Sequence, residues 1–164
     1  MAPDINNAGK VHTCGAEISI QADPLPGLNL FANLGVLKTK IDQWSYASQT
    51  GTIDYQGNRL PYSPEYTFSL GTTYRLDNGL FMGADASGMG AYYGDPGNRM
   101  KQKAFELFNL RLGYETESFD LVFWCKNLFD QSYFTVLDEM MNTGVLKAVE
   151  GDPRSLVVTF RYRF

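Results

Sequence analysis

The chain has 164 residues, of which 20% are charged and 14% aromatic, with a formal net charge of −4 and a pI near 4.9. This length suffices for one domain with a core, and the composition argues against disorder. The acidic balance argues against nucleic-acid binding, and no apolar run approaches the ~18–20 residues of a transmembrane helix. A transmembrane β-strand needs only ~9–11 residues of alternating character, so the membrane is not excluded.

The first residues, Met-Ala-Pro-Asp, show no basic segment followed by an apolar core. No signal peptide is therefore visible, although a complete exported protein carries one. We expect the chain to be a fragment, a mature form or a protein that is not exported.

A period of two in hydrophobicity predicts seven strands and no amphipathic helix. Side chains in a strand point alternately to its two faces, and apolar and polar residues follow this alternation in several segments. The predicted strands lie at about residues 11–22, 28–41, 66–76, 80–93, 108–114, 119–128 and 156–164. The sequence thus predicts an all-β fold, an antiparallel up-and-down meander of about seven strands.

Short and long connections alternate strictly between these strands. The short ones lie at residues 23–27, 77–79 and 115–118, and the long ones at about 42–65, 94–104 and 131–154. In an antiparallel meander, alternate connections lie at the same end, so one rim has tight turns and the other has long loops. Outer-membrane barrels show this asymmetry, which favours a membrane barrel over a soluble sheet.

Aromatic residues gather near both ends of the predicted strands. Tyr74 and Tyr114 lie at the short-turn ends, whereas Tyr92 and Tyr133 lie at the long-loop ends. Two such groups match the two water interfaces of a bilayer. The alternative is that aromatic residues simply favour strand ends near turns.

The last predicted strand has an aromatic face at the end of the chain. Phe160, Tyr162 and Phe164 share this face, and Arg161 and Arg163 lie on the other. Such a face is costly in water and suits a membrane interface. Bacterial outer-membrane barrels finish in this way, and their closing strand is read by the assembly machinery, so these three aromatics are the candidate assembly signal. A soluble antiparallel sheet is the alternative.

The first long loop supplies the candidate ligand-binding residues, Trp44, Tyr46, Tyr55 and Arg59. Aromatic rings with a cation can contact an anionic, ring-bearing ligand through stacking and charge. The alternative is that they form an interfacial belt and pack the loop. No catalytic constellation, phosphate-binding glycine motif or spaced set of metal ligands is present, so we expect no enzyme, no metal and no cofactor.

Several segments together resemble the C-terminal part of the β-barrel of TonB-dependent outer-membrane receptors. Residues 126–130, followed by Tyr133, look like the exit of the penultimate strand in that family, and residues 151–154 look like its final loop. Residues 7–9, 15–17 and 24–28 resemble an earlier hairpin, and residues 58–61 with 64–67 are similar to the loop that precedes another down-strand. These segments cover nearly the whole chain in family order.

The resemblance implies that residues 1–164 are the C-terminal portion of a barrel of about 22 strands, without its signal peptide, plug domain and earlier strands. It implies import of a ferric siderophore or similar scarce nutrient across the outer membrane of a Gram-negative bacterium. The implied partners are outer-membrane lipid, the barrel-assembly machinery and the ligand, with the TonB system reached only through the absent plug. The alternatives are a self-contained soluble β-barrel or sandwich that binds a ligand, and a small non-transporting outer-membrane barrel.

Overall fold

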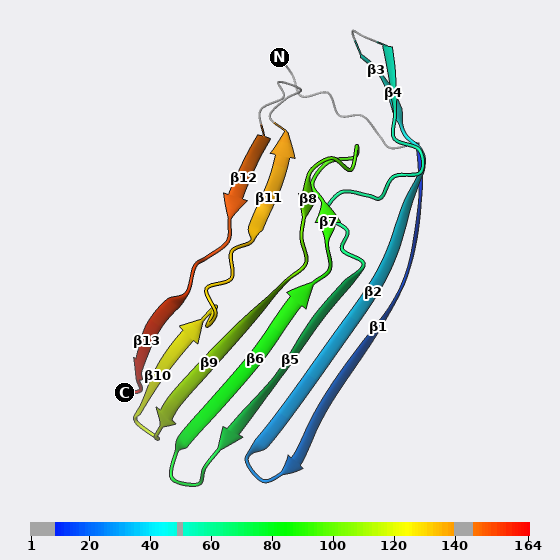
Figure 1. Ribbon diagram of the computed structural model, residues 1–164. Coiled ribbons are helices and arrows are strands. Elements are labelled where there is room, and N and C mark those ends of the chain that lie inside the picture. Colours follow the sequence, from blue (N-terminus) through cyan, green and yellow to red (C-terminus); the bar gives the residue numbers. More distant parts are fainter. Residues whose placement is uncertain (1–8, 49–50, 140–145) are drawn as a thin grey trace.

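A seven-stranded antiparallel sheet makes up most of the molecule (Figure 1). The computed structural model describes residues 9–48, 51–139 and 146–164. In spatial order, the strands are β1 (Lys10–Leu25), β2 (Leu28–Gln43), β5 (Tyr66–Arg75), β6 (Leu80–Met89), β9 (Phe105–Glu115), β10 (Phe119–Lys126) and β13 (Ser155–Tyr162). Each strand pairs with the next along the sheet. The predicted meander of about seven strands is confirmed.

Tight turns join β1 to β2, β5 to β6 and β9 to β10 at one end of the sheet (Figure 1). The first turn requires glycine, because Gly27 has a φ of +76° and a Cβ there would lie 2.1 Å from the carbonyl oxygen of Arg75. The long connections lie at the opposite end. The predicted division into a turn rim and a loop rim is therefore confirmed.

The long connections carry three hairpins that the sequence pattern did not predict. They are β3 (Ser45–Ser48) with β4 (Gly51–Asp54), β7 (Tyr92–Tyr93) with β8 (Lys101–Gln102), and β11 (Phe134–Glu139) with β12 (Leu146–Glu150). The predicted fourth strand, 80–93, accordingly divides into β6 and β7. The fifth begins at Phe105, directly after the end predicted for the second long connection at residue 104.

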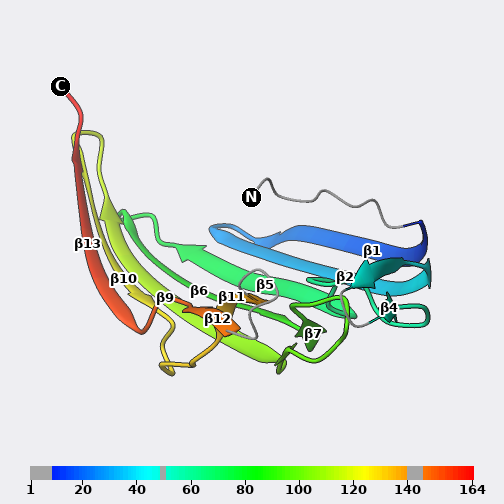
Figure 2. The ribbon, with the colours of Figure 1, turned by 90° about the horizontal axis from the view of Figure 1, so that it is seen from above.

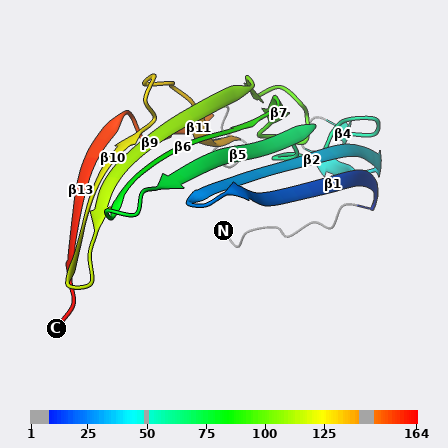
Figure 3. The same cartoon turned by 90° about the horizontal axis from the view of Figure 1, so that it is seen from below.

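The sheet is curved into an open trough (Figures 2 and 3), and its two faces differ in chemistry. One face is apolar and open: Leu156 is 80% exposed and Phe160 64%. The other carries most of the polar side chains and is shielded: Thr73 is 4% exposed and Asp120 7%. Side chains converge on the concave side of a curved sheet, so we identify the polar face as the concave inner face and the apolar face as the outer face.

Within the described residues, the sheet does not close, since β1 and β13 each pair on one side only. No helix among the described residues is long and apolar enough to cross a membrane.

Candidate functional site

The first and second long connections, residues 44–65 and 90–104, are joined by side-chain amides. Arg59 and Asn98 bond reciprocally: the Arg59 N–H donates to Asn98 Oδ1 at 2.9 Å, and Asn98 Nδ2 donates to the Arg59 carbonyl at 2.9 Å. Asn58 Nδ2 adds a bond of 2.8 Å to the Pro96 carbonyl. Asn98 has a φ of +55°, a left-handed conformation that asparagine tolerates better than most residues. Asparagine suits this position in two ways: its backbone adopts the left-handed conformation, and its side-chain amide links the two connections.

Two tyrosines join these connections to the third, residues 127–154. The Tyr62 hydroxyl donates to the Leu137 carbonyl, and the Tyr92 hydroxyl donates to the Phe134 carbonyl at 3.1 Å. The rings of Tyr62 and Tyr92 lie 5.8 Å apart. Burial, with a smaller effect of the neighbouring Tyr62, raises the pKa of Tyr92, which keeps its hydroxyl a donor. We call these three connected segments the loop layer.

Asp95 fixes the second connection. Its Oδ1 accepts the N–H groups of Arg99 and Met100, each at 2.8 Å, and its Oδ2 accepts Arg99 Nε at 3.0 Å. Burial acts to raise the pKa of Asp95, but the bonds from Met100 and Arg99 outweigh it, and the net pKa is lowered. The carboxylate therefore stabilises this loop in its ionised form.

The structure brings two of the predicted ligand residues together. The rings of Trp44 and Tyr55 meet edge to face, with centroids 5.7 Å apart and an interplanar angle of 83°. Both side chains are half-buried. Tyr46 lies in β3, but its side chain lies outside the described part of the structure.

The fourth predicted residue, Arg59, is engaged with the loop layer itself. Its Nη2 donates to the carbonyls of Ser63 and Ala91 at 2.9 and 3.3 Å, and its Nη1 lies 3.3 Å from the Glu65 carboxylate. The guanidinium also lies over the ring of Tyr93. These contacts hold the guanidinium between the first two connections, and the prediction that it contacts a ligand stays a prediction.

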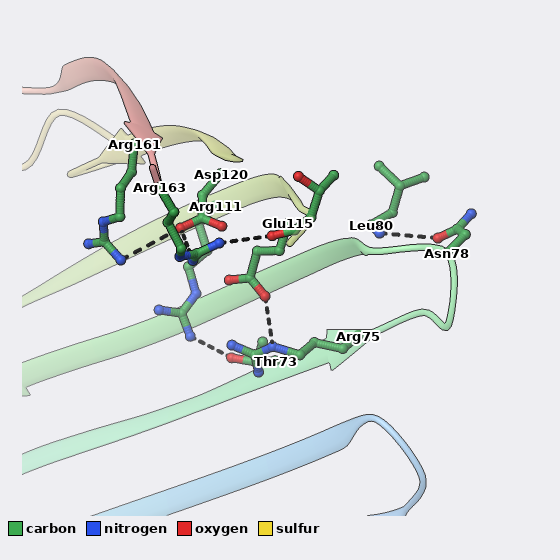
Figure 4. A network of polar contacts seen from close by, with 10 residues as sticks. Thr73, Arg75, Asn78, Leu80, Arg111, Glu115, Asp120, Arg161 and Arg163 are labelled. Atoms are coloured by element: carbon green, nitrogen blue, oxygen red, sulfur yellow. Dashed lines mark hydrogen bonds and ion pairs between the residues drawn. The ribbon is translucent and has the colours of Figure 1, made fainter. Parts of the chain in front are cut away.

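The inner face near the turn rim carries a network of arginines and carboxylates (Figure 4). Asp120 lies 2.5 Å from Arg163 Nη2 and 3.6 Å from Arg161 Nη1. One strand away, Arg111 donates to the Thr73 hydroxyl at 2.5 Å and lies over the ring of Trp124. Alternation in the sequence puts these residues on one face, but only the strand register brings them into contact.

A further ion pair of the same network joins Arg75 Nε to Glu115 Oε2 at 3.5 Å. The network therefore holds four arginines, one from β5, one from β9 and two from the end of β13, and the carboxylates of Glu115 and Asp120 balance part of their charge.

The predicted assembly residues lie on the outer face at the turn rim. Phe160 and Tyr162 are largely exposed, and Phe164 is fully exposed. The ring of Phe160 lies 6.1 Å from that of Phe119, and the rings of Tyr162 and Phe164 lie 5.2 Å apart. Their recognition by an assembly machinery stays a prediction.

Aromatic residues near the two rims differ in exposure. Tyr74 and Tyr114 are exposed on the outer face near the turn rim, as an interfacial belt requires. At the loop end, Tyr92 is buried and Tyr133 stacks on Phe105 with centroids 4.5 Å apart. These two residues therefore pack the loop layer, and their assignment to the second belt was wrong.

An apolar, exposed outer face, a polar inner face and opposite rims of turns and loops define the wall of an outer-membrane type of β-barrel. The family model described as "TonB dependent receptor-like, beta-barrel" matches residues 3–128. The chain belongs to this family, whose members are proteins of the Gram-negative outer membrane.

The curated relatives are siderophore receptors. The catecholate siderophore receptor Fiu of Escherichia coli (strain K12) is 25% identical over 161 residues, which are 95% of this chain and 20% of that protein. The probable TonB-dependent siderophore receptor PiuA of Acinetobacter baumannii is also 25% identical, over 95% of this chain and 21% of its own. The chain thus spans about a fifth of the length of these relatives.

Solved structures share the fold. The ferric yersiniabactin uptake receptor FyuA from Yersinia pestis superposes with a TM-score of 0.81 at 25% identity, over 96% of this chain and 24% of that one. The siderophore receptor PiuA from Acinetobacter baumannii gives a TM-score of 0.80 at 24% identity, over 93% of this chain and 22% of that one.

Proposed function

We propose that this chain forms part of the wall and the outer loop layer of a TonB-dependent receptor that imports a ferric siderophore. Of the curated relatives named above, Fiu is named a catecholate siderophore receptor and PiuA a probable TonB-dependent siderophore receptor. We also propose that residues 1–164 are the C-terminal portion of the barrel. This second proposal rests on the resemblance of residues 126–130 and 151–154 to segments close to the family's last strand.

The exposure of the outer face is the observation that carries the proposal. Large apolar side chains recur on it from β1 to β13, for example Ile18, Leu34, Leu70, Leu112 and Val158. A soluble sheet covers such a face with a second layer or loses stability by exposing it to water. Lipid supplies that cover without a second protein layer, so a barrel wall in a membrane accounts for this exposure and a soluble barrel or sandwich does not.

The loop layer supports a role in ligand capture. It lies at the rim opposite the tight turns, which is the extracellular side in outer-membrane barrels. We propose that the Trp44–Tyr55 pair, with Tyr46, contacts the ligand by stacking. Arg59 either adds charge to this surface or holds it in place through the carbonyls of the loop layer.

The proposed partners are outer-membrane lipid, the ferric ligand and the barrel-assembly machinery. The assembly machinery would read Phe160, Tyr162 and Phe164, which are exposed together at the turn rim. The TonB system would act through the plug domain of the whole receptor. We propose a transporting role without enzymatic activity, since the relatives are named as receptors.

The proposal is tested by deleting the gene in its native host, in a background that lacks other siderophore receptors. Uptake of radioactive iron is measured with ferric catecholate, hydroxamate and carboxylate siderophores in turn. We expect uptake of at least one class to fall to background and to return when the gene is restored. A matched strain without TonB should behave like the deletion.

Unchanged uptake of every siderophore class would contradict the import function. Restored uptake in a strain without TonB would contradict the coupling. The Trp44→Ala variant tests the loop surface separately, with an increase in the apparent KM for uptake as the expected result.

A further inference from the structure

The outer face of the β1–β2 hairpin changes from apolar to cationic along its length. The register pairs His12 with Lys40 and Cys14 with Lys38, whereas Ile18 pairs with Leu34 nearer the turn. Lys38 and Lys40 are exposed, while Thr39 and Ile41, which alternate with them, are buried on the inner face. Both lysines therefore point outward, on the same side as the apolar surface.

The height of the two lysines matches the edge of a membrane. The pair Leu28–Tyr74 lies at the level of the lower aromatic belt. At ~3.3 Å per residue and a strand tilt of ~45°, Lys38 and Lys40 lie about 23 and 28 Å above Leu28. The apolar band of an outer-membrane barrel is about 25 Å tall. The two amines thus fall where lipid headgroups begin.

Residues near Lys38 and Lys40 also indicate that the edge of the membrane lies at this height. Tyr66 pairs with Val36, one outward position before Lys38, and its side chain is exposed as expected at an interface. The nearby carboxylates are already engaged, since Asp42 contacts His12 and Glu65 pairs with Arg59. Among the described residues, no ion pair joins either lysine to a carboxylate.

We propose that Lys38 and Lys40 form a binding site for the phosphorylated headgroup of a lipid in the outer leaflet. The acyl chains would lie along Ile18, Leu34 and Val36, and the phosphate would contact the two amines. Amines adjacent to an apolar surface favour an amphiphile with an anionic head over a free anion, because both parts of the ligand are then satisfied. The site rests on the proposed membrane placement but is independent of siderophore import.

The test compares lipid A with dephosphorylated lipid A, which keeps the acyl chains and lacks the charged head. The whole receptor that contains this chain is held in a neutral detergent, and bound lipid is measured by native mass spectrometry. The double variant Lys38→Gln/Lys40→Gln should weaken binding of phosphorylated lipid A roughly tenfold. The same variant should leave binding of the dephosphorylated lipid unchanged.

Two control variants distinguish a specific binding site at Lys38 and Lys40 from a general effect of positive charge on lipid binding. Lys101→Gln/Lys103→Gln removes the same charge from exposed positions in and beside β8 and should bind like the unaltered chain. Lys38→Arg/Lys40→Arg should keep most of the affinity. Equal loss in the β8 variant, or no loss in the Gln variant, would overturn the proposal, and so would full displacement of the lipid by millimolar inorganic phosphate.

Flotation with neutral phosphatidylcholine vesicles distinguishes this proposal from the membrane placement. If the whole receptor and both Gln variants float equally but lipid A binding does not depend on Lys38 and Lys40, only the headgroup site is wrong. If the whole receptor does not float at all, the barrel-wall function fails and the headgroup site fails with it.

Discussion

The two ends of the sheet are stabilised in different ways. At the turn end, short backbone turns join adjacent strands, and Gly27 and Gly79 with positive φ allow the chain to reverse within a few residues. At the loop end, segments far apart in the sequence are joined by side chains, such as Tyr62 with Leu137 and Asn98 with Arg59. The wall is thus specified locally by its strand ladders, whereas the loop layer depends on individual contacts. Changes in the wall should affect the whole fold, and changes in the loop layer should affect local opening.

The largest effect is expected for a charge on the outer face of the wall. Leu110 lies midway along β9 on this face, and Leu110→Arg should lower the free energy of unfolding in lipid vesicles by about 2–4 kcal/mol. Val157→Arg is the matched control, since it places the same charge at a similar height on the inner face. Urea titration followed by tryptophan fluorescence measures both, and equal losses would contradict the assignment of the two faces.

The turn end should be more sensitive to added bulk than the loop end. Gly27→Ala combines positive φ with a Cβ 2.1 Å from a backbone oxygen, whereas Gly57→Ala, with a φ of +88°, meets nothing within 4 Å. We expect the loop substitution to cost about 1–2 kcal/mol of strain and the turn substitution to cost more. The same titration measures them, and a larger loss for Gly57→Ala would reverse the comparison.

Removal of the Asp95 carboxylate should open the second connection without unfolding the wall. Asp95→Ala removes the acceptor of the Arg99 N–H and of the buried Met100 N–H, at a local cost of about 1–3 kcal/mol. Hydrogen exchange at the Met100 amide should become faster, while exchange in β6 stays unchanged. Asp54→Ala, which removes an exposed carboxylate bonded to the Gln56 N–H, is the control and should leave Met100 protected.

The same carboxylate makes this protection depend on pH. Its pKa is lower in the folded than in the unfolded chain, so its contribution is fully present above the ordinary value of about 3.9. The contribution is lost as the pH falls through the lower, folded pKa. Met100 protection, corrected for intrinsic exchange, should therefore decrease only in this acid range and should show no such decrease in Asp95→Ala.

The smallest effect is expected for the loss of one side-chain contact, between Tyr62 and Leu137, that joins two connections of the loop layer. Tyr62→Phe removes the hydroxyl that joins the first and third connections, at a cost of about 0.5–1.5 kcal/mol. Exchange at the Leu137 amide, which donates to this hydroxyl, should become faster. Tyr66→Phe on the outer face is the control, and an equal effect there would show that the bridge does not act locally.

The wall was predictable because its two environments impose a period of two on the sequence. Residues such as Phe108, Leu110 and Leu112 alternate with polar neighbours, and β9 was placed from this pattern alone. The same rule failed at the loop end of β6, where the predicted strand 80–93 runs through Gly90 and Ala91 although β6 ends at Met89 and β7 begins at Tyr92. Alternation therefore located the strands well and their loop ends less well.

The loop layer was not predictable from local pattern. The Tyr62–Leu137 bond joins residues 75 positions apart, and the β7–β8 hairpin pairs only two residues on each side. Arg59 was selected for its charge, yet its carbonyl and carboxylate partners lie in two different connections. Such contacts depend on how the wall positions the three connections in space. A local sequence pattern does not predict that arrangement.

The length of β2 has a consequence for what can reach this protein from outside the cell. Its 16 residues rise about 37 Å at ~3.3 Å per residue and ~45° of tilt, against an apolar band about 25 Å tall. In the proposed orientation, the strand therefore continues about 12 Å past the band, and the β3–β4 hairpin lies beyond its end (Figure 1). This hairpin is the segment of the loop layer best placed for contact with antibodies on intact cells.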